Sequence, residues 1–285
     1  MLEQLRYVRL PTTALAKAAE FATGTIGLEL AEQGEDFARF RSDEKAYSLE
    51  YDASPQTPSP VVGLEVRSDR QLAEVAQRLA AIGLSVEGGP AELATHRRIK
   101  NGIGFADFSG NRFEIVVRHQ VKALRYFPSR DAGILGLSGI ALRSTEIERD
   151  CEIWTEIFKV EIRDFVGRSA YLGFDDRHHR LSLHPSDRAG LLQVSFEVEN
   201  LNNIMQSYYF LTNRQVRILH GPGRLPCSGE VFLTFEGPDL VAYRYGLGME
   251  TGRRGLAPRQ FTEAPESYCN WGSPSLIPEL SGGVM

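Results

Sequence analysis

The chain has 285 residues, of which 42% are hydrophobic and 24% are charged, as in an ordinary globular protein. Its formal net charge of −5 argues against nucleic acid or an anionic membrane as a partner. No apolar run approaches the length of a membrane span, the start lacks the apolar core of a signal peptide, and the 3 cysteines are widely spaced. We therefore expect a cytoplasmic protein with reduced thiols.

The first elements predicted in chain order are a strand at 5–10, a helix at 12–27 and three short strands between 28 and 52. A Pro-rich stretch at 54–60 leads to a strand at 61–66 and a helix at 69–83. In that helix Leu72, Val75 and Leu79 recur at helical spacing before Gly83, a natural stop. A turn at 109–111 precedes the last strand of this half. The order of elements indicates two successive β-α-β-β-β modules.

The same plan returns from about residue 135, with helices predicted at 145–158 and 201–213. The tail, residues 249–285, is rich in Pro and Gly and has no periodicity. Its aromatic residues Phe261, Tyr268 and Trp271 are unfavourable to leave in water. We expect the middle of the tail to pack on a domain surface or a partner subunit, and its last residues to fray.

An internal repeat relates the two halves. "YVRLPTTALAKAAEF" from Tyr7 returns as "GIALRSTEIERDCEI" from Gly139, and "VVGLEVRSDRQ" from Val61 returns as "QVSFEVENLNN" from Gln193. Glu114 corresponds in the same way to Arg244. Repeats this long indicate duplicated domains rather than a solenoid. We predict an N-terminal domain at 1–126, a linker at 127–134, a second domain carrying the pocket at 135–248, and the tail.

Both halves resemble the vicinal oxygen chelate superfamily, and the whole chain resembles its two-domain extradiol (catechol meta-cleaving) dioxygenases. The resemblance implies an α+β fold of four βαβββ modules in two cup-shaped mixed sheets. In the resembling enzymes the second cup holds Fe(II) with two His and one Glu, which leaves sites open for substrate and O2. The segments "GLSGIALR", "QVSFEV" and "YRYGLG" place Gly139, Gln193 and Arg244 at those three positions.

These three residues predict that the metal site is lost. Glycine supplies no ligand atom, a Gln carbonyl is a weak neutral donor, and arginine stays protonated and repels a cation. We therefore expect no metal and no cofactor.

Other pocket positions follow from the same resemblance. "FDDRHHRLSL" places the family's pocket acid/base at His179, and Tyr171 falls where the family has an aromatic residue against the substrate. "GPGRLPCSGEVFLTF" places Leu225 and Thr234 where the family has a hydrogen-bonding His and Tyr. These replacements make the far wall of the pocket less polar.

Each retained residue also has a purely structural interpretation. His179 can be kept for strand packing, and Arg244 can pair with Glu197, Glu236 or another carboxylate near the cup instead of clamping a substrate anion. His179 and His184 differ by five positions, so we expect them on opposite faces of one strand. His220 is expected in a surface loop.

Three hypotheses follow for the function. The first is a metal-independent enzyme of an aromatic-compound pathway, in which His179 performs acid–base chemistry, Arg244 holds an anionic oxygen and Tyr171 lines the pocket. Its reaction is an isomerisation, hydration, C–C cleavage or cofactor-free oxygenation of an aromatic or ring-opened small molecule. The second is a non-catalytic binding protein or pseudo-enzyme subunit. The third is an extradiol dioxygenase with unorthodox Fe(II) or Mn(II) ligands. A homo-oligomer is expected.

Overall fold

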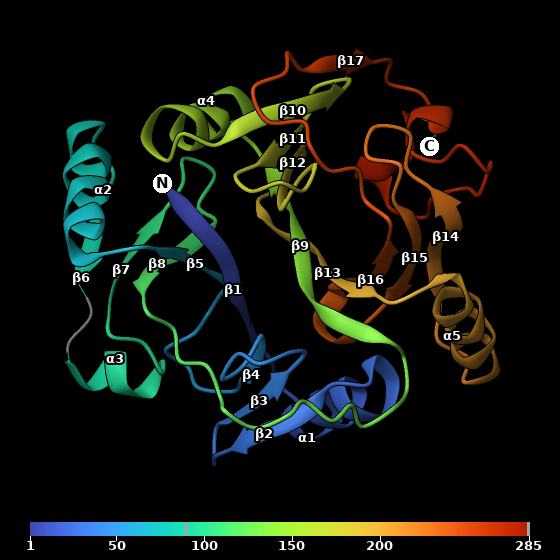
Figure 1. Ribbon diagram of the computed structural model, residues 1–285, viewed down its shortest axis with the longest axis horizontal. Helices are drawn as coiled ribbons and strands as arrows, with labels where there is room; N and C mark the ends of the chain where they lie inside the picture. The colour runs from blue at the N-terminus through green and yellow to red at the C-terminus, as the bar shows by residue number, and fades with distance from the viewer. Residues whose placement is uncertain (89–90, 284–285) are drawn as a thin grey trace.

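The computed structural model describes residues 1–88 and 91–283, and within them the backbone forms two large mixed sheets (Figure 1). The strand order is β2-β3-β4-β1-β5-β8-β7-β6 in the first sheet and β14-β15-β16-β13-β9-β12-β11-β10-β17 in the second. The first sheet contains β1 (Leu2–Pro11), β2 (Glu29–Gln33), β3 (Phe37–Arg41), β4 (Leu49–Asp52), β5 (Val61–Val66), β6 (Val86–Gly88), β7 (Asn101–Ala106) and β8 (Arg112–Val117). The second contains β9 (Ile134–Ser144), β10 (Glu161–Val166), β11 (Ser169–Gly173), β12 (Leu181–Pro185), β13 (Gly190–Val198), β14 (Ile218–Arg224), β15 (Val231–Glu236), β16 (Ala242–Leu247) and β17 (Arg259–Phe261).

Each sheet is built from two βαβββ modules whose first strands meet antiparallel at its centre, β1 beside β5 and β9 beside β13. This arrangement confirms the predicted α+β fold of four modules in two mixed sheets. Equivalent rows of paired residues cross the centres of the two sheets. The rows are Tyr7, Gly63 and Glu114 in the first sheet, and Gly139, Ser195 and Arg244 in the second. The sequence repeat therefore corresponds to a spatial repeat.

Two of the four predicted helices form as expected: α2 (Asp69–Ala81) and α5 (Leu201–Asn213). The side chains of Ser68 and Asn200 cap them by accepting backbone N–H groups of the first turn. Gly83 takes a φ of +84°, which lets the chain leave α2 in the left-handed region. Each of the other two predicted helices begins as an α-helix and continues as a π-helix. These are α1 (Leu15–Glu20) with the π-helical η1 (Phe21–Ile26), and α4 (Ile147–Glu152) with η2 (Ile153–Ile157).

Short elements complete the described chain: α3 (Ala91–His96) and the 3-10 turns η3 (Pro238–Leu240), η4 (Pro265–Ser267) and η5 (Pro278–Leu280). Across the described ranges, every helix is too short or too polar to cross a bilayer.

The two halves of the chain share one apolar core. Trp154 of η2 packs edge-on against Phe113 of β8, with ring centroids 4.8 Å apart. Phe21 of η1 lies 5.5 Å from Tyr243 of β16, whose hydroxyl is 2.6 Å from that of Tyr51. Each half thus sends a helical segment onto the sheet of the other. The predicted limit at 126 falls between β8 and β9, and the predicted start of the second domain at 135 is the second residue of β9.

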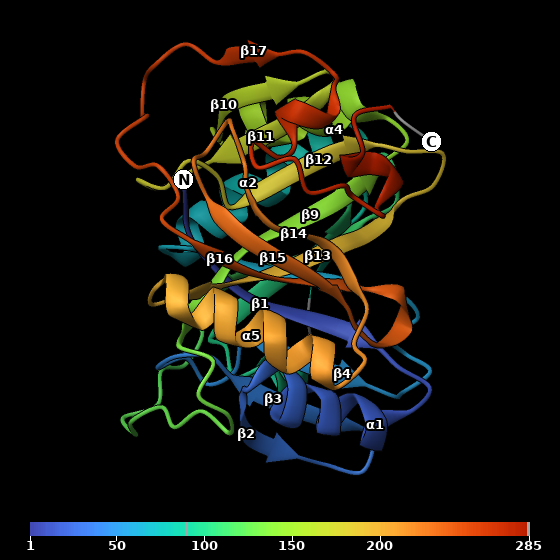
Figure 2. The ribbon, with the colours of Figure 1, turned by 90° about the vertical axis from the view of Figure 1, so that its right-hand side faces the viewer.

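The tail runs along the second sheet, where β17 adds a parallel edge strand beside β10 (Figures 1 and 2). Four of its side chains are buried: Tyr268, Cys269, Ile277 and Leu280. Phe261 is half-buried and Trp271 is 52% exposed. The residues expected to fray include 284–285, which lie outside the described residues.

Asp150 ties the two halves together through a buried carboxylate. It accepts hydrogen bonds from the backbone N–H groups of Phe108 (3.0 Å) and Ser109 (3.3 Å), and from the hydroxyl of Ser144 (2.6 Å). We predict that Asp150→Ala lowers the free energy of unfolding by about 2–4 kcal/mol, because these donors lose a charged acceptor. Urea unfolding measures the change. Glu148→Ala, which removes an exposed ion pair to Arg168 from the same helix, is the control and should have little effect. Equal losses in the two variants would contradict the role of Asp150.

Candidate functional site

The second sheet forms a cup that holds a cavity of ≈ 20 Å³, about the space of one water molecule. Strands β9, β13 and β16 contribute Gly139, Gln193 and Arg244 to its lining. His179, from the turn before β12, and Tyr171 of β11 line the same cavity. The structure therefore brings together the residues singled out in the sequence, in a space too small for an aromatic ring.

Arg244 is a buried cation with a defined set of partners. Its Nε donates to Thr234 Oγ1 at 2.9 Å, and its Nη1 lies 3.4 Å from Glu230 Oε2. The guanidinium stacks over the ring of Phe232, 4.2 Å from the centroid. Burial raises the pKa of Glu230, and the charge of Arg244 offsets part of that rise. The carboxylate beside Arg244 is therefore held less firmly in its charged form than an exposed one.

Arg244 does pair with a carboxylate near the cup, but neither of the two named from the sequence, Glu197 and Glu236, is that partner. Glu197 pairs with Arg177 at 2.6 Å, and Glu236 lies 3.8 Å from Arg217. Glu230 takes that place because β15, which begins one residue after it, pairs directly with β16.

Gln193 of β13 and Gly139 of β9 line the same cavity as Arg244. The amide nitrogen of Gln193 donates to Ser195 Oγ at 2.9 Å, while its buried oxygen Oε1 has no hydrogen-bond partner among the described residues. A Cβ at Gly139 would come 3.2 Å from the carbonyl oxygen of Arg180. The backbone before β12 thus occupies part of the space that a side chain at residue 139 would need.

A chain of hydrogen bonds leads from Asp164 to His179. Asp164 Oδ2 is 2.7 Å from His178 Nε2, and His178 Nδ1 is 3.0 Å from His179 Nδ1. Burial raises the pKa of Asp164, but hydrogen bonds from His178 and Arg259 outweigh it and hold that pKa well below its usual range. The carboxylate can only accept, so His178 donates to it from Nε2. If the Nδ1 atom of His178 is the acceptor in its contact with His179, then His179 carries its proton on Nδ1 and presents an unprotonated Nε2.

The Nε2 atom of His179 is available to a bound molecule. Within the described ranges no hydrogen bond reaches it, and the ring lines the cavity. Burial, with the nearby His178 and Arg244, lowers the pKa of His179 well below its usual value. The imidazole is therefore neutral near pH 7 and can accept a proton.

His184 also faces this cavity, so the expectation that it lies opposite His179 was wrong. His179 precedes β12 and is not bound by strand alternation, whereas His184 lies within the strand. Tyr171 packs edge-on against both rings, 4.9 Å from His179 and 5.8 Å from His184. Burial lowers the pKa of His184 to about 3, and its ring nitrogens lie near the hydroxyls of Ser169 and Ser182.

Of the two residues predicted in the far wall, Leu225 is buried and lines the cavity, whereas Thr234 is not among the described residues that line it. The buried hydroxyl of Thr234 accepts from Arg244 instead. The tail supplies Tyr268 and Leu280 to the same lining. The tail thus closes the cup, which the sequence did not indicate.

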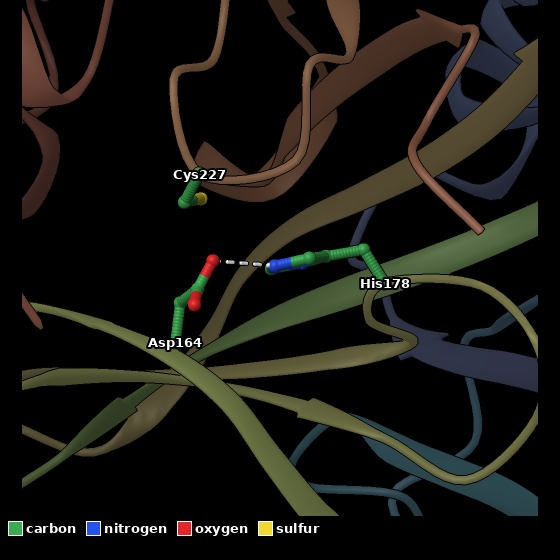
Figure 3. Close-up of side chains that lie close together, drawn as sticks. All are labelled: Asp164, His178 and Cys227. Atoms are coloured by element: carbon green, nitrogen blue, oxygen red, sulfur yellow. Dashed lines mark hydrogen bonds and ion pairs between the residues drawn. The ribbon is translucent and has the colours of Figure 1, made fainter. Parts of the chain in front are cut away.

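A second cluster of chemically active side chains lies beside this cavity, at Asp164, His178 and Cys227 (Figure 3). One ligand atom from each of the three lies within 4.8 Å of the others, and all three residues are buried. Their donor types suit a metal, but Arg259 already binds Asp164 at 2.7 Å and Arg253 lies 3.8 Å from it. Two guanidinium groups oppose a cation there. Asp164 is 14 residues from His178 in the chain, and sequence reasoning did not select it.

His220 is buried on β14, so its expected place in a surface loop was also wrong. Its ring packs 4.7 Å from that of Phe232, under the guanidinium of Arg244. It lines the cavity with His179 and His184.

Comparisons with known proteins agree with this geometry. A family model described as the Glyoxalase/Bleomycin resistance protein/Dioxygenase superfamily matches residues 4–115. An iron-dependent extradiol dioxygenase of Rhodococcus jostii (strain RHA1) is 25% identical over 224 residues, which cover 71% of this chain and 75% of the relative. A 3-methylcatechol 2,3-dioxygenase of Pseudomonas putida (strain F1) is 27% identical over 193 residues, 62% of this chain and 66% of the relative.

Solved structures show the same fold over nearly the whole chain. BphC, a halotolerant catechol dioxygenase, superposes with a TM-score of 0.88 at 21% identity, covering 98% of this chain and 97% of that one. The Mn(II)-bound glyoxalase from Novosphingobium aromaticivorans gives a TM-score of 0.87 at 20% identity, covering 98% and 93%.

The family model thus matches part of the first half of the chain, while the solved structures share the fold over nearly all of it. The shared fold is that of the catechol dioxygenase structures.

The buried histidines of the cup make stability depend on pH. Burial, with a contribution from Arg244, lowers the pKa of His220 to about 3 in the folded chain, against about 6.5 when unfolded. Below about pH 6.5 the unfolded chain therefore binds a proton that the folded chain does not, and stability falls as pH falls. Between about pH 7.5 and about pH 5, His220 lowers the free energy of unfolding by about 2 kcal/mol. We predict that the His220→Phe variant does not show this part of the loss. Urea unfolding at both pH values measures this, and an unchanged pH slope would contradict it.

Proposed function

We propose that the chain is a metal-independent enzyme of an aromatic-compound pathway that performs acid–base chemistry in the second-domain cup. The observation that carries the proposal is the chain from Asp164 through His178 to His179, which ends on an unpaired Nε2 in the cavity that Arg244 lines. A proton acceptor and a fixed positive charge in one small space suit a substrate that loses a proton to become an oxyanion.

The proposed absence of iron chemistry rests on the donor set of the cup. Of the three residues in the family's ligand positions, Gly139 has no donor and Gln193 offers only an amide oxygen. Arg244 brings a positive charge that opposes a cation. These residues do not fit Fe(II) or Mn(II), and the carbonyl of Arg180 crowds the space beside Gly139.

The proposed roles of Arg244, His179 and Glu230 follow from the charge that each side chain carries or can take up. A phenolic or enolic oxygen bound by the guanidinium of Arg244 loses its proton more readily, because the anion it forms is paired. His179 Nε2 accepts that proton, and an anion nearby raises the pKa of the imidazole that holds it. Asp164 and His178 hold the ring of His179 in the tautomer that can accept. Glu230 balances Arg244 until the anion arrives, and its raised pKa lets it take a proton then.

Access to the cup requires the tail to move. Tyr268 and Leu280 of the tail line a cavity of ≈ 20 Å³, so an aromatic or ring-opened molecule needs them displaced. The relatives named for 3-methylcatechol and biphenyl-2,3-diol support an aromatic or ring-opened substrate. We place the reaction among isomerisations, hydrations, C–C cleavages and cofactor-free oxygenations. We also propose that the protein is cytoplasmic and forms a homo-oligomer.

A second candidate is a non-catalytic binding protein or pseudo-enzyme subunit. The pairing of Arg244 with Glu230 favours it, because the cation already has a partner, and so does the small volume of the cup.

The two candidates are separated by turnover of the ring-opened products of 3-methylcatechol and biphenyl-2,3-diol, coloured enolates that are followed by absorbance and mass spectrometry. We predict turnover without added metal. His179→Ala should lower kcat about 10²–10⁴-fold, because it removes the proton acceptor. Arg244→Met should raise KM, because it removes the charge that holds the anion.

His96→Ala is the matched control, since His96 is exposed on α3 of the first half. Full activity of His179→Ala, with circular dichroism unchanged, would sink the catalytic assignment. No turnover by the wild-type protein of either compound would favour the binding protein.

A further inference from the structure

The first sheet also forms a cup, and its cavity of ≈ 820 Å³ is far larger than the ≈ 20 Å³ of the second. Cavities of about 300–1,000 Å³ are typical of small-molecule sites. The function proposed above makes no use of this space.

Two glycines keep the first cup open. Gly102 and Gly104 of β7 pair with Val116 and Glu114 of β8. Directly paired residues share a face of the sheet, and all four line the cavity. This stretch of β7 therefore presents hydrogen atoms to the cup where other residues would present side chains.

The second cup is filled at the equivalent positions. Thr234 of β15 pairs with Arg244, just as Gly104 pairs with Glu114, and Phe232 occupies the place of Gly102. The ring of Phe232 lies under the guanidinium of Arg244, and Thr234 accepts its Nε–H. The same fold thus gives one closed, cationic cup and one open cup.

The floor of the open cup is a balanced network of ion pairs. Arg9 reaches Glu50 at 2.8 Å, Asp52 at 2.9 Å and Glu114 at 3.1 Å. Arg97 reaches Glu114 at 3.3 Å, and the network also includes Arg39, 2.6 Å from Glu50. The three guanidiniums and three carboxylates cancel in charge, while their edges still offer donors and acceptors at the floor. Such a floor suits a hydroxyl group, which both donates and accepts, better than an anion.

The walls and rim restrict the ligand further. Phe37, Val61, Ile99 and Val116 give the walls apolar surface. At the rim, Glu35 and Asp36 are exposed carboxylates. Arg112 is also at the rim, but it is paired with Glu87 at 3.2 Å. An acidic rim above apolar walls repels anions and admits neutral rings.

We infer that the first-domain cup is a second ligand site, for a neutral, hydroxylated polycyclic or biaryl molecule. The apolar walls hold the rings, and the hydroxyl meets Glu114 and Arg97 at the floor. The site stands independently of the proposed activity, because binding here requires neither His179 nor turnover.

The test is isothermal titration calorimetry of the full chain near pH 7 with 2-naphthol, a neutral phenol, and 2-naphthoate, an anion on the same ring system. We expect 2-naphthol to bind and 2-naphthoate to bind at least about tenfold more weakly, because of the acidic rim. Gly104→Trp should abolish 2-naphthol binding by filling the cup. A Cβ at residue 104 has no neighbour closer than 3.9 Å, so the strand accommodates the change.

The matched control is Gly24→Trp, at a residue of η1 where an added Cβ meets nothing within 4 Å. This variant should bind 2-naphthol as the wild-type protein does. Amide chemical shifts of the wild-type protein give a second readout that needs no variant. They should change on adding 2-naphthol at Val61, Ile103 and Glu114.

Three results would overturn the inference: no binding of 2-naphthol, binding unaffected by Gly104→Trp, or shift changes confined to the second half of the chain.

Discussion

The second cup is organised around one buried positive charge. A guanidinium away from water is stable only with compensating partners, and Arg244 has a carboxylate, a hydroxyl and an aromatic face in Glu230, Thr234 and Phe232. The same charge acts on the histidines that line the cavity. It adds to burial in lowering the pKa of His179, His184 and His220, so all three stay neutral. A cup with this centre favours an anion and disfavours a cation.

The neutral histidines are not equivalent, and the difference lies in what each one contacts. His184 is placed between two serine hydroxyls, and His220 packs on Phe232. His179 is linked to the carboxylate of Asp164 through the imidazole of His178, and that carboxylate is itself fixed by Arg259 of the tail. The tail therefore does two things: it closes the cup, and it holds the far end of the hydrogen-bond chain.

Much of the fold could be predicted from the sequence because duplication leaves a regular signal. The repeat relates Tyr7 to Gly139 and Glu114 to Arg244, and the strand pairing places both pairs on equivalent rows. The capped helix α2 was predictable from its spacing and its Gly83 stop. The π-helical turns η1 and η2 were not, because no local residue pattern signals a change from i→i+4 to i→i+5 bonding.

The candidate site was predictable only in part, and the residues that the sequence did not indicate were missed for the same physical reason. Gly139, Gln193 and Arg244 lie on strands that the repeat aligns, and His179 lies in a segment picked out by the family resemblance. Asp164 and Glu230 join them through strand pairing and tail docking, which depend on the whole fold. Burial of His220 and exposure of Trp271 likewise follow from how β14 and the tail pack, since neither residue type decides burial alone.

Elemental analysis shows whether the cup of Arg244 works without a metal. The protein is purified anaerobically, mixed with Fe(II) and Mn(II), and desalted, with the 3-methylcatechol 2,3-dioxygenase relative prepared alongside as a positive control. We expect no stoichiometric metal in this chain under conditions that load the relative. One tightly held iron or manganese per chain would contradict it and return catechol ring cleavage as the leading function.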